Sequence, residues 1–317
     1  MTARLLPAVL LCALFAAATP QGAWQQAAAA QDPQRSPSTA SGQAFRSAAD
    51  VVSVEVSVRR EKRSVTGLTA ADFDLLDNGV AQQIDTISYE RLPIDVTVAL
   101  DVSASVTGPV LEQLRRSVRQ LQPDLGARDR LKLVAFNMRV ERLVDFRAPG
   151  SVSDGALASL PPVGSSAIFD TLAVALGGAP SSGRRHLIIV FTDGKDSASV
   201  TNPEGLLEMA RRSTPTIAAV LASSTPEQPV STFAPVPFMD IRDLYDQLAR
   251  ETGGTVVYTH TDEDLSSTFR RVLSEFRSSY VLYFSPHGVE PSGFHTLDVK
   301  VKQPGVEVRS RRGYAWR

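Results

Sequence analysis

The chain has 317 residues, enough for one large domain and a smaller one, and 43% of them are hydrophobic, which is ordinary for a packed core. Its 33 Lys and Arg nearly balance its 34 Asp and Glu, giving a formal net charge of −1. A surface that follows nucleic-acid phosphates carries a basic excess, so this balance argues against nucleic acid as a partner.

The N-terminus has the pattern of a secretory signal peptide. Arg4 precedes an apolar run from Leu5 to Ala18 that is too short to cross a bilayer comfortably. We therefore expect a signal peptide over residues 1–23, a secreted or periplasmic (cell-envelope) location, and no membrane span after cleavage. The alternative is that the run remains as an uncleaved anchor. The one cysteine, Cys12, lies in this segment, so the processed chain would hold no disulfide or Cys-ligated metal.

Residues 24–45 are rich in Ala, Gln, Ser and Pro, which predicts a disordered linker. The next segment, residues 46–92, reads as β structure. Valines alternate with polar residues from Val52 to Val58, the period of a half-buried strand. Asn78-Gly79 supplies the positive φ of a tight turn, so residues 73–76 and 80–89 are expected to form a hairpin. The segment is too small to be stable alone.

Residues 93–278 alternate strand and helix. Expected strands cover residues 94–101, 130–138, 140–146, 187–191, 216–222 and 255–258, and expected helices cover residues 110–121, 167–176, 203–212, 240–251 and 262–276. This alternation predicts an α/β fold with a doubly wound, mostly parallel sheet covered by helices on both faces. The tight turn near Arg139 indicates one antiparallel edge strand.

Residues 279–317 return to β structure, with strands expected over residues 280–285, 294–302 and 306–311. Neither terminal β segment has enough strands to be stable alone. We therefore expect the two to pair into a small β-sandwich, with the α/β domain inserted between them. The alternative is two separate β appendages.

Oxygen-bearing side chains follow two of the buried strands. Asp101 ends the strand from Ile94, Ser103 and Ser105 follow at alternate positions, and Asp193 ends the most apolar strand. Ser166 stands just before a predicted helix. Ligands of open α/β sheets lie beyond the carboxyl ends of the strands, so these five oxygens would converge if the two strands are neighbours. Carboxylates and hydroxyls are hard donors that suit Mg²⁺.

Three ordered motifs resemble the von Willebrand factor type A (VWA) domain: Asp101-x-Ser103-x-Ser105, Gly-Ser-Ser-Ala-Ile-Phe-Asp at 164–170, and Phe-Thr-Asp-Gly at 191–194. The flanking Val-Thr-Gly-Leu-Thr at 65–69 and Val-Arg-Ser-Arg-Arg-Gly-Tyr at 308–314 look like those of secreted bacterial proteins built around this domain. The resemblance implies a metal-ion-dependent adhesion site (MIDAS) on a VWA fold.

By this resemblance Ser103, Ser105 and Ser166 would ligate Mg²⁺, or Mn²⁺ or Ca²⁺, directly, while Asp101 and Asp193 would act through water. An open position would accept the carboxylate of a protein ligand that presents Asp or Glu. Ser166 departs from the family's Thr and lacks its stiffening β-methyl group. The implied function is a secreted, non-catalytic, metal-dependent adhesion module.

Other interpretations remain open at the sequence level. Asp101 and its serines can also simply cap the following helix and satisfy turn backbone. A Mg²⁺-dependent phosphohydrolase would use Asp101 as phosphoryl acceptor, although Ser103 stands where a second carboxylate would be needed. A third alternative is a structural envelope protein with a degenerate metal site.

Three other groups of residues are expected to be solvent-exposed features without a role in the site. These are the neighbouring acids Asp170 and Asp196, the basic end with Arg309, Arg311, Arg312 and Arg317, and the Pro-rich loop from Pro226 to Phe238. The alternative interpretation of this loop, with Phe233 and Phe238, is a partner-contacting loop.

Overall fold

The computed structural model describes residues 51–90, 92–151, 154–158, 161–178, 183–223, 241–260 and 264–316. The predicted signal peptide, linker and Pro-rich loop lie outside these described residues. Within them, no helix has the length and apolar character needed to cross a membrane.

The inserted domain is built on a six-stranded sheet with the order β11-β10-β9-β6-β7-β8. Neighbouring strands are parallel except β7 and β8, which are antiparallel at the sheet edge. The predicted α/β fold and its antiparallel edge strand are therefore confirmed. The strands are β6 (Ile94–Asp101), β7 (Arg130–Phe136), β8 (Val140–Arg147), β9 (Arg185–Thr192), β10 (Thr216–Ser223) and β11 (Thr255–His260).

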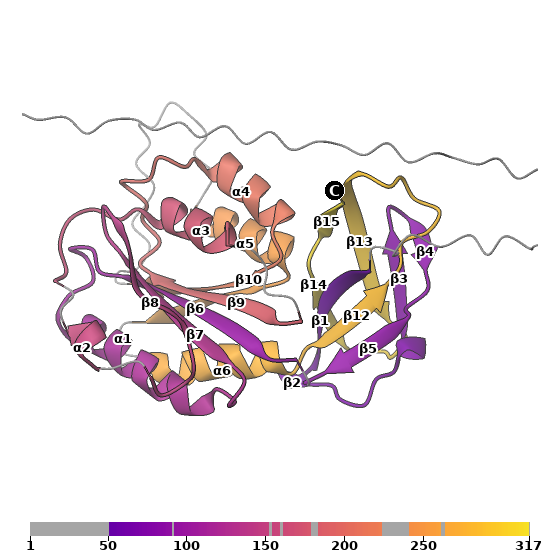
Figure 1. Ribbon diagram of the computed structural model, residues 1–317, viewed down its shortest axis with the longest axis horizontal. Helices are drawn as coiled ribbons and strands as arrows, with labels where there is room; N and C mark the ends of the chain where they lie inside the picture. The colour runs from indigo at the N-terminus through magenta and orange to yellow at the C-terminus, as the bar shows by residue number, and fades with distance from the viewer. Residues whose placement is uncertain are drawn as a thin grey trace, which may run out of the picture. The chain divides into compact units, whose positions relative to one another are not determined.

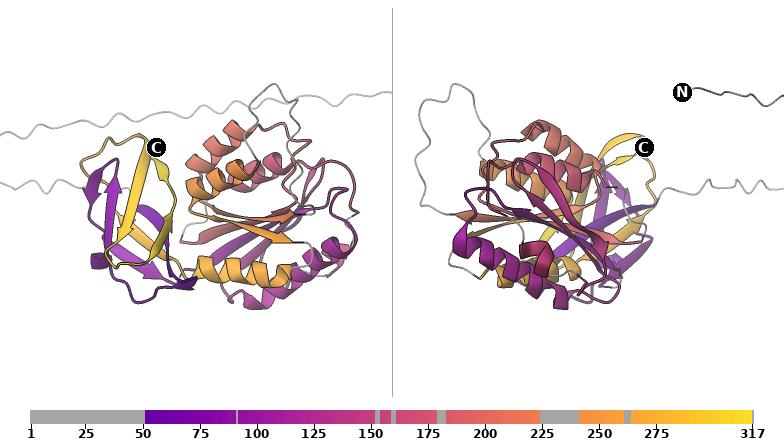
Figure 2. Two further views of the ribbon diagram at one scale, coloured as in Figure 1. Left: turned by 180° about the vertical axis from the view of Figure 1, so that it is seen from behind. Right: turned by 60° about the vertical axis from the view of Figure 1, so that its left-hand side comes forward.

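Helices cover both faces of this sheet (Figure 1). One apolar core joins the sheet to α1, α2 and α6, and a second joins it to α3, α4 and α5. Figure 2 shows the same two layers from behind. The helices are α1 (Gly108–Leu121), α2 (Asp154–Ala158), α3 (Ile168–Leu176), α4 (Pro203–Arg212), α5 (Ile241–Thr252) and α6 (Leu265–Arg277), and a 3-10 turn, η2 (Gln122–Asp124), follows α1.

Strand β6 is the buried centre of the domain, since all eight of its residues are buried. Its polar side chains are therefore paired: Asp95 accepts hydrogen bonds from Arg130 and Arg184, and the Thr97 hydroxyl lies 2.9 Å from Nε2 of His186. Such a strand leaves its carboxyl end, at Asp101, rigidly placed.

The remaining strands form two antiparallel sheets that share one apolar core. One sheet has the order β14-β1-β12-β5, with β2 paired to β1, and the other has the order β15-β13-β3-β4. Their bounds are β1 (Val52–Arg60), β2 (Arg63–Ser64), β3 (Phe73–Asp77), β4 (Val80–Gln82), β5 (Thr86–Tyr89), β12 (Tyr280–Phe284), β13 (Gly293–Val301), β14 (Glu307–Ser310) and β15 (Gly313–Trp316), with a 3-10 turn, η1 (Ala70–Asp72), before β3.

Strands from the two ends of the chain pair in both of these sheets. β1 lies between β12 and β14, and β13 pairs with β3. Val54 and Leu282 from one sheet share their core with Leu75 and Leu297 from the other. The expected pairing of the terminal segments around the inserted domain is therefore present.

One expected strand is wrong, because it divides between the two sheets. The run 80–89 becomes β4 and β5, and the backbone N–H of Asp85 donates to the Tyr283 carbonyl where the chain crosses over. The expected strand 306–311 is present as β14, and the chain then continues into β15 of the other sheet, which was not predicted. A Cβ at Gly313 would lie 2.1 Å from the His295 carbonyl oxygen, so only glycine allows this approach.

The expectation of a solvated basic end is wrong for Arg309 and Arg311, whereas the Arg312 side chain is exposed. Arg311 is buried, and its guanidinium donates to the carbonyls of Gly313 and Ser213. Arg309 lies 3.6 Å from the carboxylate of Glu275. These arginines fasten the terminal strands to the inserted domain, and Arg317 lies outside the described residues.

The junction between the two parts is centred on Glu55 of β1. Its carboxylate accepts hydrogen bonds from Arg185 of β9, at 2.9 Å, and from the Thr216 hydroxyl of β10, at 3.0 Å. Arg185 also donates to the carbonyls of Phe276 and Arg277 and lies 4.1 Å from the Phe276 ring centroid. The described residues from Val51 to Trp316 accordingly belong to one compact unit.

Candidate metal-binding site

The site is built where the neighbouring parallel strands β6 and β9 end side by side. Three loops meet there: residues 102–107 after β6, residues 161–167 before α3, and residues 193–202 after β9. This is the edge at which open α/β sheets bind ligands.

Asp101 is the centre of the hydrogen-bond network. It is fully buried; its Oδ1 accepts from the Ser103 N–H at 2.9 Å, and its Oδ2 accepts from the hydroxyls of Ser166 at 3.1 Å and Thr192 at 2.7 Å. The hydroxyl oxygens of Ser103 and Ser105 lie 3.0 Å apart. The structure thus brings four of the five expected residues together through hydrogen bonds.

Asp193, the fifth residue, comes directly after Thr192. It is half-buried, and its Oδ1 accepts from the Lys195 N–H at 3.2 Å. Burial raises the pKa of Asp101 above its ordinary value, and the negative charge of Asp193 adds to that rise. Asp193 therefore acts on the cluster through its charge.

Backbone hydrogen bonds hold the three loops together. The Ala104 N–H donates to the Gly164 carbonyl, and the Val163 N–H donates to the Val102 carbonyl, each at 3.0 Å. The Ser166 carbonyl accepts from the N–H groups of Ser197 and Ala198. The side chains around Asp101 are consequently presented by a fixed frame.

Asp170 and Asp196 are part of this frame, contrary to the expectation that they are solvated. Asp196 accepts from the Phe169 N–H at 2.9 Å and from the Ser199 hydroxyl at 2.6 Å. Asp170 accepts from the N–H groups of residues 200 and 201. The two carboxylates fasten the loop after β9 to the beginning of α3.

Two residues of the site were not expected from the sequence. Thr192 donates to Asp101 and accepts from the Gly194 N–H at 3.1 Å. Tyr245 of α5 is buried, and its hydroxyl has no hydrogen-bond partner among the described residues. Burial raises the pKa of Tyr245, and the charges of Asp196, Asp101 and Asp193 raise it further. Thr192 could have been recognised in the sequence, because its hydroxyl comes one residue before Asp193. No sequence feature indicated Tyr245.

The donor set fits a hard divalent cation. Every hydrogen bond described above for Asp101 comes from a neutral hydroxyl or amide, and the nearby charge of Asp193 is also negative. A positive charge would offset this pair of carboxylates. Among the described residues, no three His, Cys, Asp or Glu side chains gather as a metal site, so hydroxyls would have to complete the shell. Mg²⁺ accepts such a shell because it retains several waters.

Comparison with known proteins gives one family. Residues 95–270 match the model of the von Willebrand factor type A domain. A segment of 77 residues is 35% identical to the E3 ubiquitin-protein ligase WAV3 of Arabidopsis thaliana, covering 22% of this chain and 10% of that protein. A segment of 133 residues is 25% identical to human inter-alpha-trypsin inhibitor heavy chain H4, covering 38% of this chain and 14% of that one. The chain thus spans only a small part of the length of these relatives.

Solved structures with similar folds include a von Willebrand factor type A protein from Catenulispora acidiphila, at 13% identity and a TM-score of 0.46, covering 86% of this chain and 65% of that chain. Another is the protein BatB from Bacteroides thetaiotaomicron, at 17% identity and a TM-score of 0.45, covering 58% of this chain and 98% of that chain. Because the family model spans more than half of the sequence, this chain belongs to the von Willebrand factor type A domain family.

Proposed function

We propose that this chain is a non-catalytic protein-binding module that uses a divalent cation to engage a carboxylate of its partner. The observation that carries the proposal is the buried Asp101, which gathers the hydroxyls of Ser166 and Thr192 beside the Ser103–Ser105 pair. VWA domains are generally adhesion or protein-binding modules, which supports the same conclusion.

The five residues of the site would have two different roles toward the cation. Ser103, Ser105 and Ser166 would offer their hydroxyls to the cation, and Asp101 and Asp193 would supply the negative charge. A bound Mg²⁺, or Mn²⁺ or Ca²⁺ in its place, would provide a Lewis-acidic position for an additional oxygen ligand.

Charge decides the kind of partner. Two carboxylates beside a divalent cation leave little net charge, so an incoming Asp or Glu side chain is not strongly repelled. The partner is accordingly a protein that presents an acidic side chain. The signal-like N-terminus supports binding of this partner outside the cytoplasm, in the periplasm, in the cell envelope or in the medium.

The test is calorimetric titration of the purified chain with Mn²⁺ and Mg²⁺. We expect one binding site in the wild type and at least a tenfold loss of affinity in Asp101→Asn, since the charge that faces the cation is removed (about 1.4 kcal/mol or more). Asp298→Asn, on an exposed position of β13, is the matched control and should bind as the wild type does. Absence of metal binding, or equal binding by Asp101→Asn, contradicts the proposal.

Binding of a carboxylate to the cation can be measured separately. Acetate added to the Mn²⁺-loaded chain should reduce the relaxation of water protons by Mn²⁺, because it replaces a bound water. A carboxylate that leaves the relaxation unchanged would limit the function to metal binding alone.

A phosphohydrolase would require Asp101 to attack phosphorus, whereas both of its oxygens accept hydrogen bonds. Turnover of p-nitrophenyl phosphate that disappears in Asp101→Asn would replace the binding proposal with this one.

A further inference from the structure

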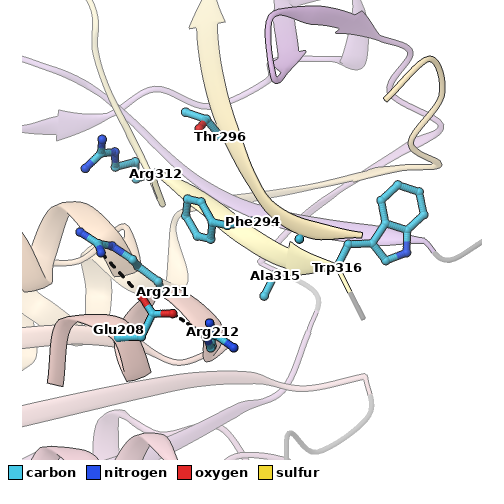
Figure 3. Close-up of a pocket in the computed structure, with 9 residues that line it drawn as sticks. Glu208, Arg211, Arg212, Phe294, Thr296, Arg312, Ala315 and Trp316 are labelled. Carbon is cyan, nitrogen blue, oxygen red and sulfur yellow. Dashed lines mark hydrogen bonds and ion pairs between the residues drawn. The ribbon is translucent and has the colours of Figure 1, made fainter. Parts of the chain in front are cut away.

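A second concave site lies away from the candidate metal-binding site, between α4 of the inserted domain and strands β13 and β15 (Figure 3). Its volume is about 450 Å³, within the usual range of small-molecule sites. Three arginines, one glutamate and the ring of Phe294 give it its chemical character, and the proposed metal-dependent function makes no use of them.

The three arginines form a chain of ion pairs with two glutamates. Glu208 lies 2.5 Å from Nε of Arg212 and 3.7 Å from Nη1 of Arg211. Nη2 of Arg211 and Nη1 of Arg312 lie 3.1 and 3.2 Å from the same oxygen of Glu251. Three guanidinium groups against two carboxylates leave one excess positive charge.

Glu251 is an unusual partner for a purely structural ion pair. It is only 3% exposed, and its second oxygen, Oε2, is buried without a hydrogen-bond partner among the described residues. Burying an unsatisfied carboxylate oxygen is destabilising. The shared Glu251 oxygen holds the guanidinium group of Arg211, from α4, close to that of Arg312, from the turn before β15.

The arginines keep hydrogen-bonding capacity for a ligand. A guanidinium carries five N–H donors, and the ion pair of Arg312 with Glu251 uses one of them. The Arg312 side chain is 61% exposed. Donors of this kind recognise planar or tetrahedral oxyanions through paired hydrogen bonds.

Phe294 adds an apolar surface beside the charges. Its side chain is 40% exposed, and its ring lies so close over Gly313 that a Cβ there would come within 2.6 Å of it. Figure 3 shows the Phe294 ring on the side of the arginines, whereas the Trp316 ring points away from them. The Trp316 ring packs edge-on against His295, at 5.3 Å between centroids.

We propose that this pocket binds a small anion that carries an apolar ring. The oxyanion pairs with the guanidinium groups held by Glu251, and the ring packs on Phe294. Such a ligand joins α4 to the terminal strands, so its binding raises the unfolding temperature of the whole chain.

The test uses the full chain and four probes, followed by NMR titration and thermal unfolding. Benzoate and phenyl phosphate combine ring and anion, inorganic phosphate supplies the anion alone, and benzyl alcohol supplies the ring alone. We expect at least one ring-bearing anion to bind about tenfold more tightly than either single-feature probe. Comparing benzoate with phenyl phosphate separates a carboxylate ligand from a phosphate ligand.

Two variants assign the binding to this pocket. Arg312→Gln should weaken the ring-bearing anions by about tenfold, and Phe294→Ser should remove their advantage over inorganic phosphate. Arg142→Gln, in an exposed ion pair on β8, is the control and should change neither value. Binding should persist with chelator and in Asp101→Asn, which keeps this test independent of the metal proposal. The inference is overturned if neither ring-bearing anion saturates, or if Arg312→Gln and Arg142→Gln bind equally in folded protein.

Discussion

Asp101 illustrates how one buried carboxylate depends on its neighbours. Its two oxygens receive an amide and two hydroxyls, all of them neutral, and a second carboxylate lies close enough to raise its pKa. The hydroxyl donors therefore orient a charge that they do not neutralise. This is the arrangement expected of a group prepared for a cation.

Thr192 should matter for metal affinity although it was absent from the expected ligand set. Thr192→Val removes the hydroxyl that donates to Asp101 at 2.7 Å and keeps the side-chain shape. Loss of such a supporting group commonly lowers metal affinity about 10- to 100-fold. Mn²⁺ titration of this variant should show a decrease of that size.

The matched control is Thr97→Val, the same substitution at a buried position of β6 that contacts His186 rather than Asp101. If both variants bind Mn²⁺ as the wild type does, the Thr192 hydroxyl has no part in the site.

At the residue scale, the sequence predicted which side chains gather at this edge of the sheet better than it predicted the residues that support them. Asp101, Ser103 and Ser105 are close in sequence, and together with the later motifs that contain Ser166 and Asp193 they indicated a site. Thr192 reaches Asp101 only because β6 and β9 pair in one register, with Leu100 opposite Phe191. That register arises only when the sheet folds, so it cannot be deduced from the local sequence of either strand.

At the scale of elements, strand β9 carries a pH-sensitive position. Burial lowers the pKa of His186 to about 4, and the charges of Lys132 and Arg130 act in the same direction, while Asp95 opposes them. The unfolded chain takes up this proton near pH 6.5, so between pH 6.5 and 4 it binds more protons than the folded chain. Stability attributable to His186 is therefore present at pH 7 and is lost on acidification.

We expect this histidine to account for a loss on the order of 2 kcal/mol in the free energy of unfolding between pH 7 and pH 5. Urea denaturation at the two pH values measures it. His186→Gln, which cannot titrate, should lose less stability by about that amount. Equal losses in the wild type and the variant would show that His186 does not carry the effect.

Helices and buried strands were predictable because their patterns are long. The apolar run 187–191 became the interior of β9, and Pro203–Arg212 became α4 with the same bounds. The division of the run 80–89 into β4 and β5 was not predictable, because both halves of the run have β character. What separates them is the crossing from one sheet to the other, which depends on partners such as Tyr283 that are remote in sequence.

At the scale of the whole molecule, Arg185 connects the inserted domain to the terminal strands. It is buried, pairs with Glu55 of β1, and donates to carbonyls at the end of α6. Arg185→Gln leaves Glu55 without its cation and removes the contact with Phe276. Breaking a buried ion pair from one side costs about 3–5 kcal/mol, so we expect a destabilisation near the lower value.

Urea unfolding followed by tryptophan fluorescence and by circular dichroism tests this prediction. Arg142→Gln breaks an exposed pair with Asp145 and should cost less than about 1 kcal/mol. In Arg185→Gln the two probes should also separate, since the two parts of the chain are less tightly coupled. Similar midpoints for the two variants would mean that the junction does not depend on this arginine.

The position of β1 has a consequence for the order of events during translation. β1 is made early, yet both of its long partners, β12 and β14, follow the complete inserted domain in the chain. At roughly 5–20 residues per second, the ribosome needs about 10–40 s to pass from one to the other. Over that interval β1 has only β2 as a native strand partner, paired with its last two residues, so the nascent chain must keep the rest of β1 from pairing with a wrong edge.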